Sequence, residues 1–325
     1  MSKNLPGIIL VQAAAISFLI VGCTAEYALR LQPASSILPD GSVPAGTPTE
    51  PGGGKNAATD PLPAPTTPQL PPLPPVVCDP FAAANIVGPE YGISGQIFAE
   101  GDSNIGYNLL SSFDYFTPAR LFNVELVLSA IDVPGRRWQN GFSTPQGNQL
   151  KVIVNGVETP FIEWFAIQGT SKIVLADGDL PGKKQFALIS DDGSTLEIQD
   201  SAGVYQTMIS NEGLHSQKLK VSESVLDFQN ATSQFPMRIN YFQGPRVHIA
   251  LQLLWRNVES DSAAHLAEPL NGAVGGEYFW DTRVTPVVQT PAYQDFLSRG
   301  WRPLRPQNFM RQSGYNRCTQ TTMGQ

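Results

Sequence analysis

Few residues of this 325-residue sequence are of the kinds that build zinc sites or nucleophilic catalytic centres, since it contains three cysteines and three histidines. The cysteines, Cys23, Cys78 and Cys318, form no Cys-x-x-Cys or Cys-x-x-His motif. No histidine has a serine and an acid at a recognisable triad spacing. Asp191 and Asp192 are adjacent, whereas the two carboxylates of a glycosidase face each other across the substrate. We therefore expect no enzymatic activity.

Positive charge is also scarce in this sequence. It has 21 Lys and Arg residues against 28 Asp and Glu residues, and its formal net charge is −7 at pH 7. A protein that binds nucleic acid neutralises phosphates with clustered cations. Nucleic acid is therefore not expected as a partner.

The N-terminus carries an apolar run from Ile8 to Val21, which is too short for an ordinary membrane span but typical of a signal peptide. It ends in Leu19 to Cys23 (LIVGC), which resembles the lipobox of bacterial lipoproteins. The resemblance implies that residues 1–22 are removed and that Cys23 is the lipid attachment site, which would anchor the protein to the membrane. The alternative is a signal peptide that happens to contain a cysteine, or an uncleaved anchor. Because Thr24 and not an aspartate follows, we expect an outer membrane lipoprotein that faces the periplasm or the cell surface.

Residues 23–77 are rich in proline, with threonine, serine, alanine and Gly52-Gly53-Gly54 between the prolines. Proline removes backbone donors, and so few large apolar residues cannot offset the entropy of ordering. We expect an extended, flexible tether. At ~3.1 Å per residue its reach is on the order of 100 Å.

Two cysteines remain once Cys23 is lipidated. Cys78 stands where the tether ends, and Cys318 lies close to the C-terminus. In an oxidising compartment such a pair is more often bridged than free. We expect a Cys78–Cys318 disulfide that ties the two ends of the folded part together; two unrelated thiols are the alternative.

Residues 78–325 have the texture of one β-rich domain. Strand-like runs bounded by turn residues occur at 122–128, 150–154, 171–175, 185–189 and 246–255. Asn155-Gly156 is typical of a two-residue hairpin, because both central positions of a type I′ turn need positive φ. One helix is expected at Ala292 to Arg299, with Gly300 placed to end it. The pattern predicts an all-β sandwich or barrel with a short C-terminal helix.

Four sequence blocks between Gly182 and Trp255 occur in a distinctive order. They are residues 190–194 (SDDGS), 211–215 (NEGLH), 237–244 (MRINYFQG) and 251–255 (LQLLW). In this order and spacing they resemble the protective-antigen domain family, a module also found in fungal flocculins, GLEYA adhesins and fibro-slime proteins. The resemblance implies an antiparallel β-sandwich. It assigns no role to the extension at 259–325.

The resemblance also implies a ligand site. In the fungal members the aspartate pair, joined by a cis peptide bond, binds calcium, and the ion helps to coordinate sugar hydroxyls. This implies calcium at Asp191 and Asp192, with Gly193, Asn211 and His215 as further ligand-binding residues. Glu212 stands where the commoner family pattern has aspartate. Local chemistry alone allows two interpretations, an oxygen-ligand site for a hard cation or a solvated Asp-Gly turn.

Two hypotheses for the function follow. The first is a non-catalytic envelope lipoprotein whose calcium-assisted sandwich binds a carbohydrate or a surface partner. The second is a structural component of an outer-membrane or surface assembly, in which the sandwich makes protein–protein contacts. Calcium-dependent binding on a glycan panel would separate the first from the second.

Overall fold

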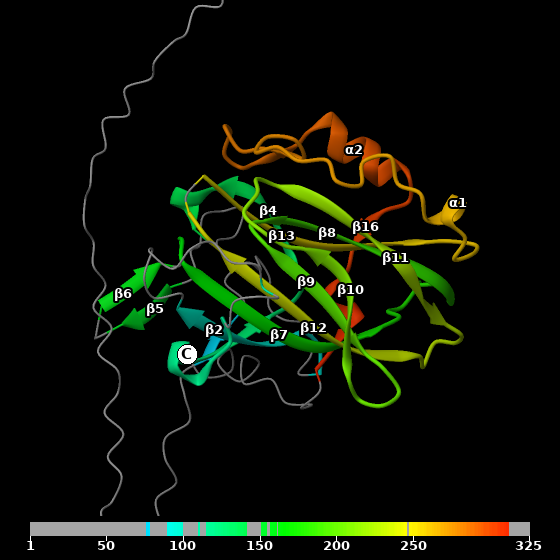
Figure 1. Ribbon diagram of the computed structural model, residues 1–325, viewed down its shortest axis with the longest axis horizontal. Helices are drawn as coiled ribbons and strands as arrows, with labels where there is room; N and C mark the ends of the chain where they lie inside the picture. Colours follow the sequence, from blue (N-terminus) through cyan, green and yellow to red (C-terminus); the bar gives the residue numbers. More distant parts are fainter. Residues whose placement is uncertain are drawn as a thin grey trace, which may run out of the picture. The chain divides into compact units, whose positions relative to one another are not determined.

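The computed structural model describes residues 76–78, 90–99, 110, 115–141, 151–154, 157–160, 162–245 and 247–311 (Figure 1). The expected signal peptide, the lipid site Cys23, nearly all of the tether and Cys318 lie outside these residues. The lipid anchor and the disulfide therefore stay predictions.

Two antiparallel sheets stack in the described part of the chain. The eight-stranded sheet runs in the order β1 (Val76–Cys78), β3 (Leu121–Leu128), β2 (Ile93–Ala99), β7 (Phe165–Val174), β12 (Gln234–Gln243), β9 (Ser194–Gln199) and β10 (Tyr205–Asn211), and β17 (Phe309–Met310) pairs with β7. The five-stranded sheet runs β11 (Lys218–Phe228), β8 (Gly182–Asp191), β13 (His248–Asn257) and β16 (Arg302–Pro303), and β4 (Asp132–Arg137) pairs with β13. Only the β1–β3 pair among these is parallel. The protein is an all-β, antiparallel sandwich, as the sequence predicts.

The core between the sheets follows the two-residue period of strands, which sends alternate side chains to opposite faces. On β7, Phe165, Ile167 and Ile173 point into this core, and on β12 Met237 and Ile239 meet them. The five-stranded sheet contributes a second alternating set to the same core, namely Phe186, Leu188, Leu251, Leu253 and Trp255. Burial of these side chains is the main stabilising contribution to the sandwich.

Most predicted elements are confirmed, with one correction. The runs at 122–128, 185–189 and 246–255 lie within or largely overlap β3, β8 and β13. The run at 150–154 corresponds to β5 (Lys151–Val154), which pairs antiparallel with β6 (Val157–Pro160). The predicted turn between these two strands lies outside the described residues. The run at 171–175 is not a separate strand. It continues β7 from Phe165, because β12 pairs with β7 along its whole length, while β2 pairs with its first half and β17 with its second.

The predicted helix forms as α2 (Pro291–Ser298). The Thr290 side chain accepts a hydrogen bond from the Tyr293 N–H at its start, and Gly300 has a φ of 88° just after its end. The described extension also contains α1 (Ala263–Leu266), β14 (Trp280–Asp281), β15 (Val288–Gln289) and a 3-10 turn at Pro306–Asn308. Two further 3-10 turns lie elsewhere, one at Pro118–Arg120 before β3 and one at Trp138–Asn140 after β4. No helix within the described ranges is long and apolar enough to cross a membrane.

Residues 263–301, here called the C-terminal layer, form a third layer on the outer face of the five-stranded sheet. Figure 1 shows α1 and α2 on one side of β8, β11 and β13, with β7, β9 and β12 on the other side. A second apolar cluster lies between this layer and the sheet, made of Ala187, Ile189, Leu219, Val221 and Leu254 from the strands and Phe279, Tyr293, Phe296 and Trp301 from the layer. The extension therefore belongs to the folded domain.

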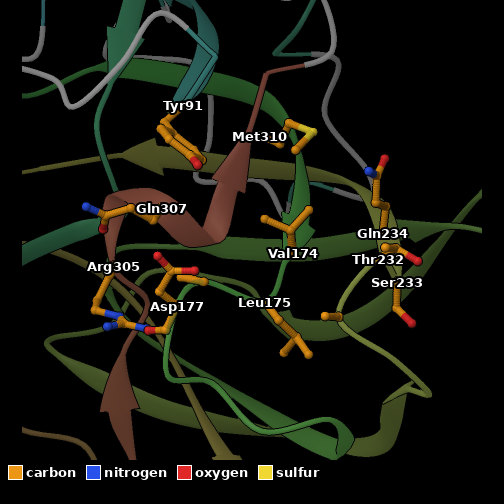
Figure 2. A pocket seen from close by; sticks show the side chains of 12 residues that line it. Tyr91, Val174, Leu175, Asp177, Thr232, Ser233, Gln234, Arg305, Gln307 and Met310 are labelled. Atoms are coloured by element: carbon orange, nitrogen blue, oxygen red, sulfur yellow. The ribbon is translucent and has the colours of Figure 1, made fainter.

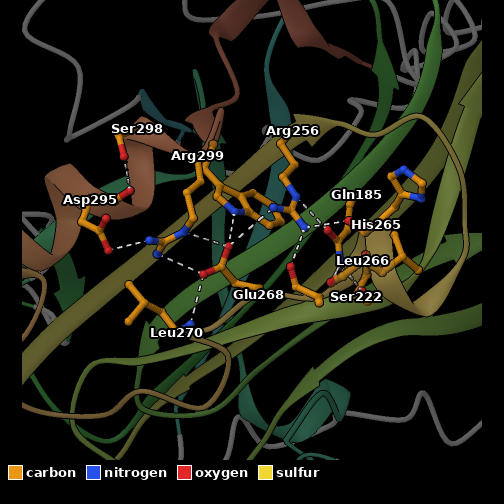
Figure 3. Close-up of polar contacts among 12 residues, drawn as sticks. Gln185, Ser222, Arg256, His265, Leu266, Glu268, Leu270, Asp295, Ser298 and Arg299 are labelled. Carbon is orange, nitrogen blue, oxygen red and sulfur yellow. Dashed lines mark hydrogen bonds and ion pairs between the residues drawn. The ribbon is translucent and has the colours of Figure 1, made fainter.

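A buried acid anchors this layer. The Glu268 side chain is fully buried and accepts a hydrogen bond from Trp301 Nε1 at 2.8 Å. It also makes ion pairs with Arg299 at 3.0 Å and with Arg256 of β13 at 3.6 Å (Figure 3). Because Arg256 belongs to the sheet and the other groups to the layer, this cluster ties the two together.

Candidate metal-binding site

The aspartate pair lies where the two sheets are joined at one end of the sandwich. Asp191 is the last residue of β8, and β9 begins at Ser194 in the other sheet. Each aspartate is only 4% exposed. The peptide bond between them is cis, the conformation that the resemblance implies.

Backbone N–H groups from two loops hold the Asp192 carboxylate. His215 N–H donates to Oδ1 at 3.0 Å, and Gly244 N–H donates to Oδ2 at 2.9 Å. Burial raises the pKa of Asp192 to about 7, although these two hydrogen bonds act to lower it. Asp192 therefore joins the loop before β11 to the turn after β12.

Asp191 is less well supplied with partners. Its carboxylate accepts a hydrogen bond from the Gln217 backbone N–H, but its Oδ2 atom has no hydrogen-bond partner and is buried. Its backbone oxygen accepts from the Tyr241 hydroxyl at 2.6 Å. Burial and the neighbouring Asp192 raise the pKa of Asp191 to about 9.

The electrostatics of the pair favour a bound cation. Within the described ranges neither carboxylate takes part in an ion pair with lysine, arginine or histidine. Two buried acids without a cationic partner must bind protons or a metal ion. Both groups offer only carboxylate oxygens, the ligand atoms that calcium prefers. The donor set fits calcium, but no group of three or more His, Cys, Asp or Glu suited to a metal occurs in the described part.

Two other predicted site residues, Gly193 and Asn211, are closely packed beside the aspartate pair. A Cβ atom at Gly193 would come within 2.2 Å of the Phe242 ring, so only glycine fits there. Asn211 is fully buried, and its Nδ2 donates to Ser190 Oγ at 3.0 Å and to the Lys218 backbone oxygen at 2.9 Å.

The His215 ring stays within its own loop. Its Nε2 lies 3.0 Å from the Asn211 backbone oxygen and its Nδ1 lies 3.0 Å from that of Ser216. Burial lowers the pKa of His215, which favours the neutral ring. The contact of this residue with the aspartate pair is through its backbone N–H.

Sequence reasoning missed two residues of the site, Gln217 and Gly244. Both donate a backbone N–H to the aspartate pair, and a backbone donor leaves no mark in the side-chain pattern. The glycine itself was the one sequence signal at Gly244. A Cβ atom there would lie 2.6 Å from Leu214 Cδ2 and 3.1 Å from Asp192 Oδ2, so a larger residue would have to displace the Leu214 side chain.

Three tryptophans, Trp255, Trp280 and Trp301, make their contacts away from the aspartate pair. Trp255 is fully buried and Trp301 is 2% exposed, so both are core residues. Trp280 belongs to the C-terminal layer and donates its Nε1–H to Gln252 Oε1 of β13 at 2.8 Å. Trp164 lies nearer, because its N–H donates to the Gln243 backbone oxygen at the end of β12, and its φ of 61° is unusual for a bulky residue.

A separate cavity of about 390 Å³ lies at the other end of β7 and β12 (Figure 2). Val174, Leu175, Met310 and Tyr91 line it together with polar residues that include Arg305. In the register of these strands Val174 pairs with Gln234, whereas Phe165 pairs with Gln243 beside the aspartate pair. About nine residues of strand, roughly 30 Å, separate the two places.

Comparisons with known proteins find only distant likeness. No family model and no curated protein match the chain. Among solved structures, the chain is similar to an anti-sigma factor domain-containing protein (16% identity, TM-score 0.31), with 56% of this chain and 47% of that chain covered. It is similar to the epithelial adhesin 6 A domain from Candida glabrata in complex with Galb1-3GlcNAc (15%, TM-score 0.32, 59% and 88% covered) and to a PA14 sugar-binding domain from an RTX adhesin (15%, TM-score 0.34, 51% and 90% covered). The chain thus spans about half the length of the first of these. Its function has to be argued from its own residues.

Proposed function

We propose that this protein is a non-catalytic binding protein of a bacterial envelope. A calcium ion at Asp191 and Asp192 would help to hold a carbohydrate ligand at one end of the sandwich. A lipid on Cys23 and the proline-rich tether would hold this domain at the outer membrane. The support comes from the motif resemblance together with the geometry of the pair.

One observation carries the proposal. Two adjacent carboxylates are 4% exposed, have raised pKa values and pair with no described cation, and Asp191 Oδ2 lacks any partner. An ordinary solvated Asp-Gly turn would keep both acids in water. Desolvated acids of this kind cluster at functional sites, because the surrounding fold must compensate for them.

When bound, calcium would neutralise the two carboxylates and offer remaining coordination positions to other oxygens. Calcium takes six to eight oxygen ligands, more than this pair supplies. Hydroxyl groups of a sugar are suitable ligands for the remaining positions. The carbohydrate is therefore the partner whose chemistry fits, and the ion would be required for its binding.

The test is a calcium titration of the purified full-length protein after removal of metal with a chelator. Isothermal titration calorimetry should show binding, and the melting temperature should rise with calcium. At a hundredfold excess over the dissociation constant the expected gain is ~2.7 kcal/mol. Asp191→Asn/Asp192→Asn should abolish the response. Asp227→Asn, a change at an exposed acid on β11, should leave it intact.

A glycan panel probed with and without calcium then tests the ligand. Binding that requires both calcium and the aspartate pair supports the proposal. A folded wild-type protein that shows neither heat nor a melting shift with millimolar calcium contradicts it. In that case the pair is a buried structural turn that binds no metal, and a stoichiometric envelope complex, sought by co-purification, becomes the better hypothesis.

A further inference from the structure

The C-terminal layer reaches the aspartate pair through a short antiparallel contact. Residues 271–276 run along the start of β11, the outermost strand of the five-stranded sheet. Leu219 N–H donates to the Ala273 backbone oxygen at 3.0 Å, and Gly272 N–H donates back to the Leu219 oxygen at 2.8 Å. Gly275 N–H donates to the Gln217 oxygen at 3.0 Å. The layer thus fixes the backbone immediately after the loop that binds the acids.

Gln217 is the residue at which this contact and the site meet. Its backbone N–H donates to the Asp191 carboxylate, and its backbone oxygen accepts from Gly275. Its side-chain Nε2 donates to the backbone oxygen of Gly276. One residue therefore binds the acid with one backbone group and the layer with its other backbone group and its side chain.

The Gln217 side chain packs closely against β4. The residue is fully buried, and a Cβ atom at Gly135 of β4 would lie within 2.4 Å of its amide carbon. The amide therefore lies directly against the backbone of Gly135, where any larger residue would displace it. Its Oε1 atom is buried without a hydrogen-bond partner. The hydrogen bonds of Nε2 and of the backbone therefore hold the Gln217 side chain in place, although its Oε1 atom has no partner.

We propose that the C-terminal layer sets the calcium affinity of the aspartate pair, with Gln217 as the positioning residue that connects them. This inference rests on the proposed calcium site. Groups that orient metal ligands are part of the metal site in energetic terms, and their loss typically costs about 10- to 100-fold in affinity. Because coupling between two sites is reciprocal, calcium must in turn stabilise the contact between residues 271–276 and β11.

The test compares two buried glutamines that both join the layer to the sheet. Gln217→Met removes the amide beside the aspartate pair. Gln185→Met removes an equally buried amide whose Nε2 donates to the backbone oxygens of Ser222 and Leu266 at 2.8 and 2.9 Å (Figure 3). Gln185 lies six residues before Asp191 on β8, roughly 20 Å away. It is the matched control.

Calcium titrations of the full-length proteins should separate the two variants. Both should melt at a lower temperature than the wild type without calcium, because both lose buried hydrogen bonds. Only Gln217→Met should weaken calcium binding, by about 10-fold or more. Hydrogen exchange gives a second readout. Calcium should slow exchange at the amides of Gly272 and Gly275 in the wild type and in Gln185→Met, but not in Gln217→Met.

The outcomes distinguish this inference from the proposed function. A wild-type protein that binds no calcium overturns both. If the wild type binds calcium and Gln217→Met binds it equally well, the inference is wrong and the site itself stands. If Gln217→Met does not fold, the wild-type exchange experiment decides, and unchanged rates at Gly272 and Gly275 on calcium addition refute the coupling.

Discussion

Replacing Asp191 by asparagine should stabilise the calcium-free protein at neutral pH. Burial and the neighbouring Asp192 raise the pKa of Asp191 from 3.8 to about 9 in the folded state. An acid whose folded pKa is raised binds its proton more tightly in the folded state than in the unfolded chain. Its contribution to stability is complete below about pH 4 and is lost as the pH rises through the window from about 4 to about 9.

The size of the effect follows from that window. Each pH unit within it costs about 1.4 kcal/mol, and pH 7 lies about three units above the unfolded pKa. The penalty at pH 7 is therefore on the order of 4 kcal/mol. Asparagine carries no charge at any pH, and its side-chain oxygen can still accept the Gln217 N–H. At about 2–4 °C per kcal/mol, the variant should melt several degrees above the wild type in chelator.

The assay carries its own control. At pH 4, which is close to the unfolded pKa of 3.8, most of this penalty is absent, so the two proteins should melt at nearly the same temperature there. Asp192→Asn should gain less at pH 7, because an amide oxygen accepts only one of the two N–H groups that Asp192 now binds. A lower melting temperature for Asp191→Asn at pH 7, or a difference that persists at pH 4, would refute the reasoning.

Three further predictions concern the anchor, the disulfide and the C-terminal layer. Cys23→Ser should release the protein from membranes or block its processing, and unchanged attachment on fractionation would contradict the lipobox. Peptide mapping under non-reducing conditions should find Cys78 joined to Cys318, whereas two free thiols would exclude the bridge. Glu268→Gln should lower the free energy of unfolding by ~3–5 kcal/mol, since it leaves the partly buried Arg256 without its fully buried counter-charge. A loss below ~1 kcal/mol in denaturant unfolding would show that the ion pairs contribute little.

The strands were predictable because their signals are local. β3 and β13 alternate or concentrate apolar residues between turn residues, and α2 has both a start residue at Thr290 and an end residue at Gly300. The aspartate pair was predictable because its identity lies in its side chains. Its burial was not, since desolvation depends on which distant loops cover it.

The C-terminal layer was not predicted, although its signal is present on β8. Phe186 and Leu188 face the core between the sheets, whereas Ala187 and Ile189 face the layer, so four successive positions are apolar. Such a run means that both faces of the strand are buried. The C-terminal layer itself has little regular structure, so its sequence shows no helix or strand periodicity that would indicate where it packs.

The strand register also determines how tension would pass through the molecule. Tyr91 pairs with Met310 at the start of β2, and Ser94 pairs with Thr170 of β7, whereas Ala99 pairs with Phe165 at the end that holds the aspartate pair. The chain enters this sheet earlier, at β1, whose three residues pair with Glu125, Leu126 and Val127 of β3 at one edge. An anchor upstream of β1 and a ligand near Asp191 would pull on the domain at these two places. The short β1–β3 ladder would then bear the load first, before the long ladders of β2, β7 and β12.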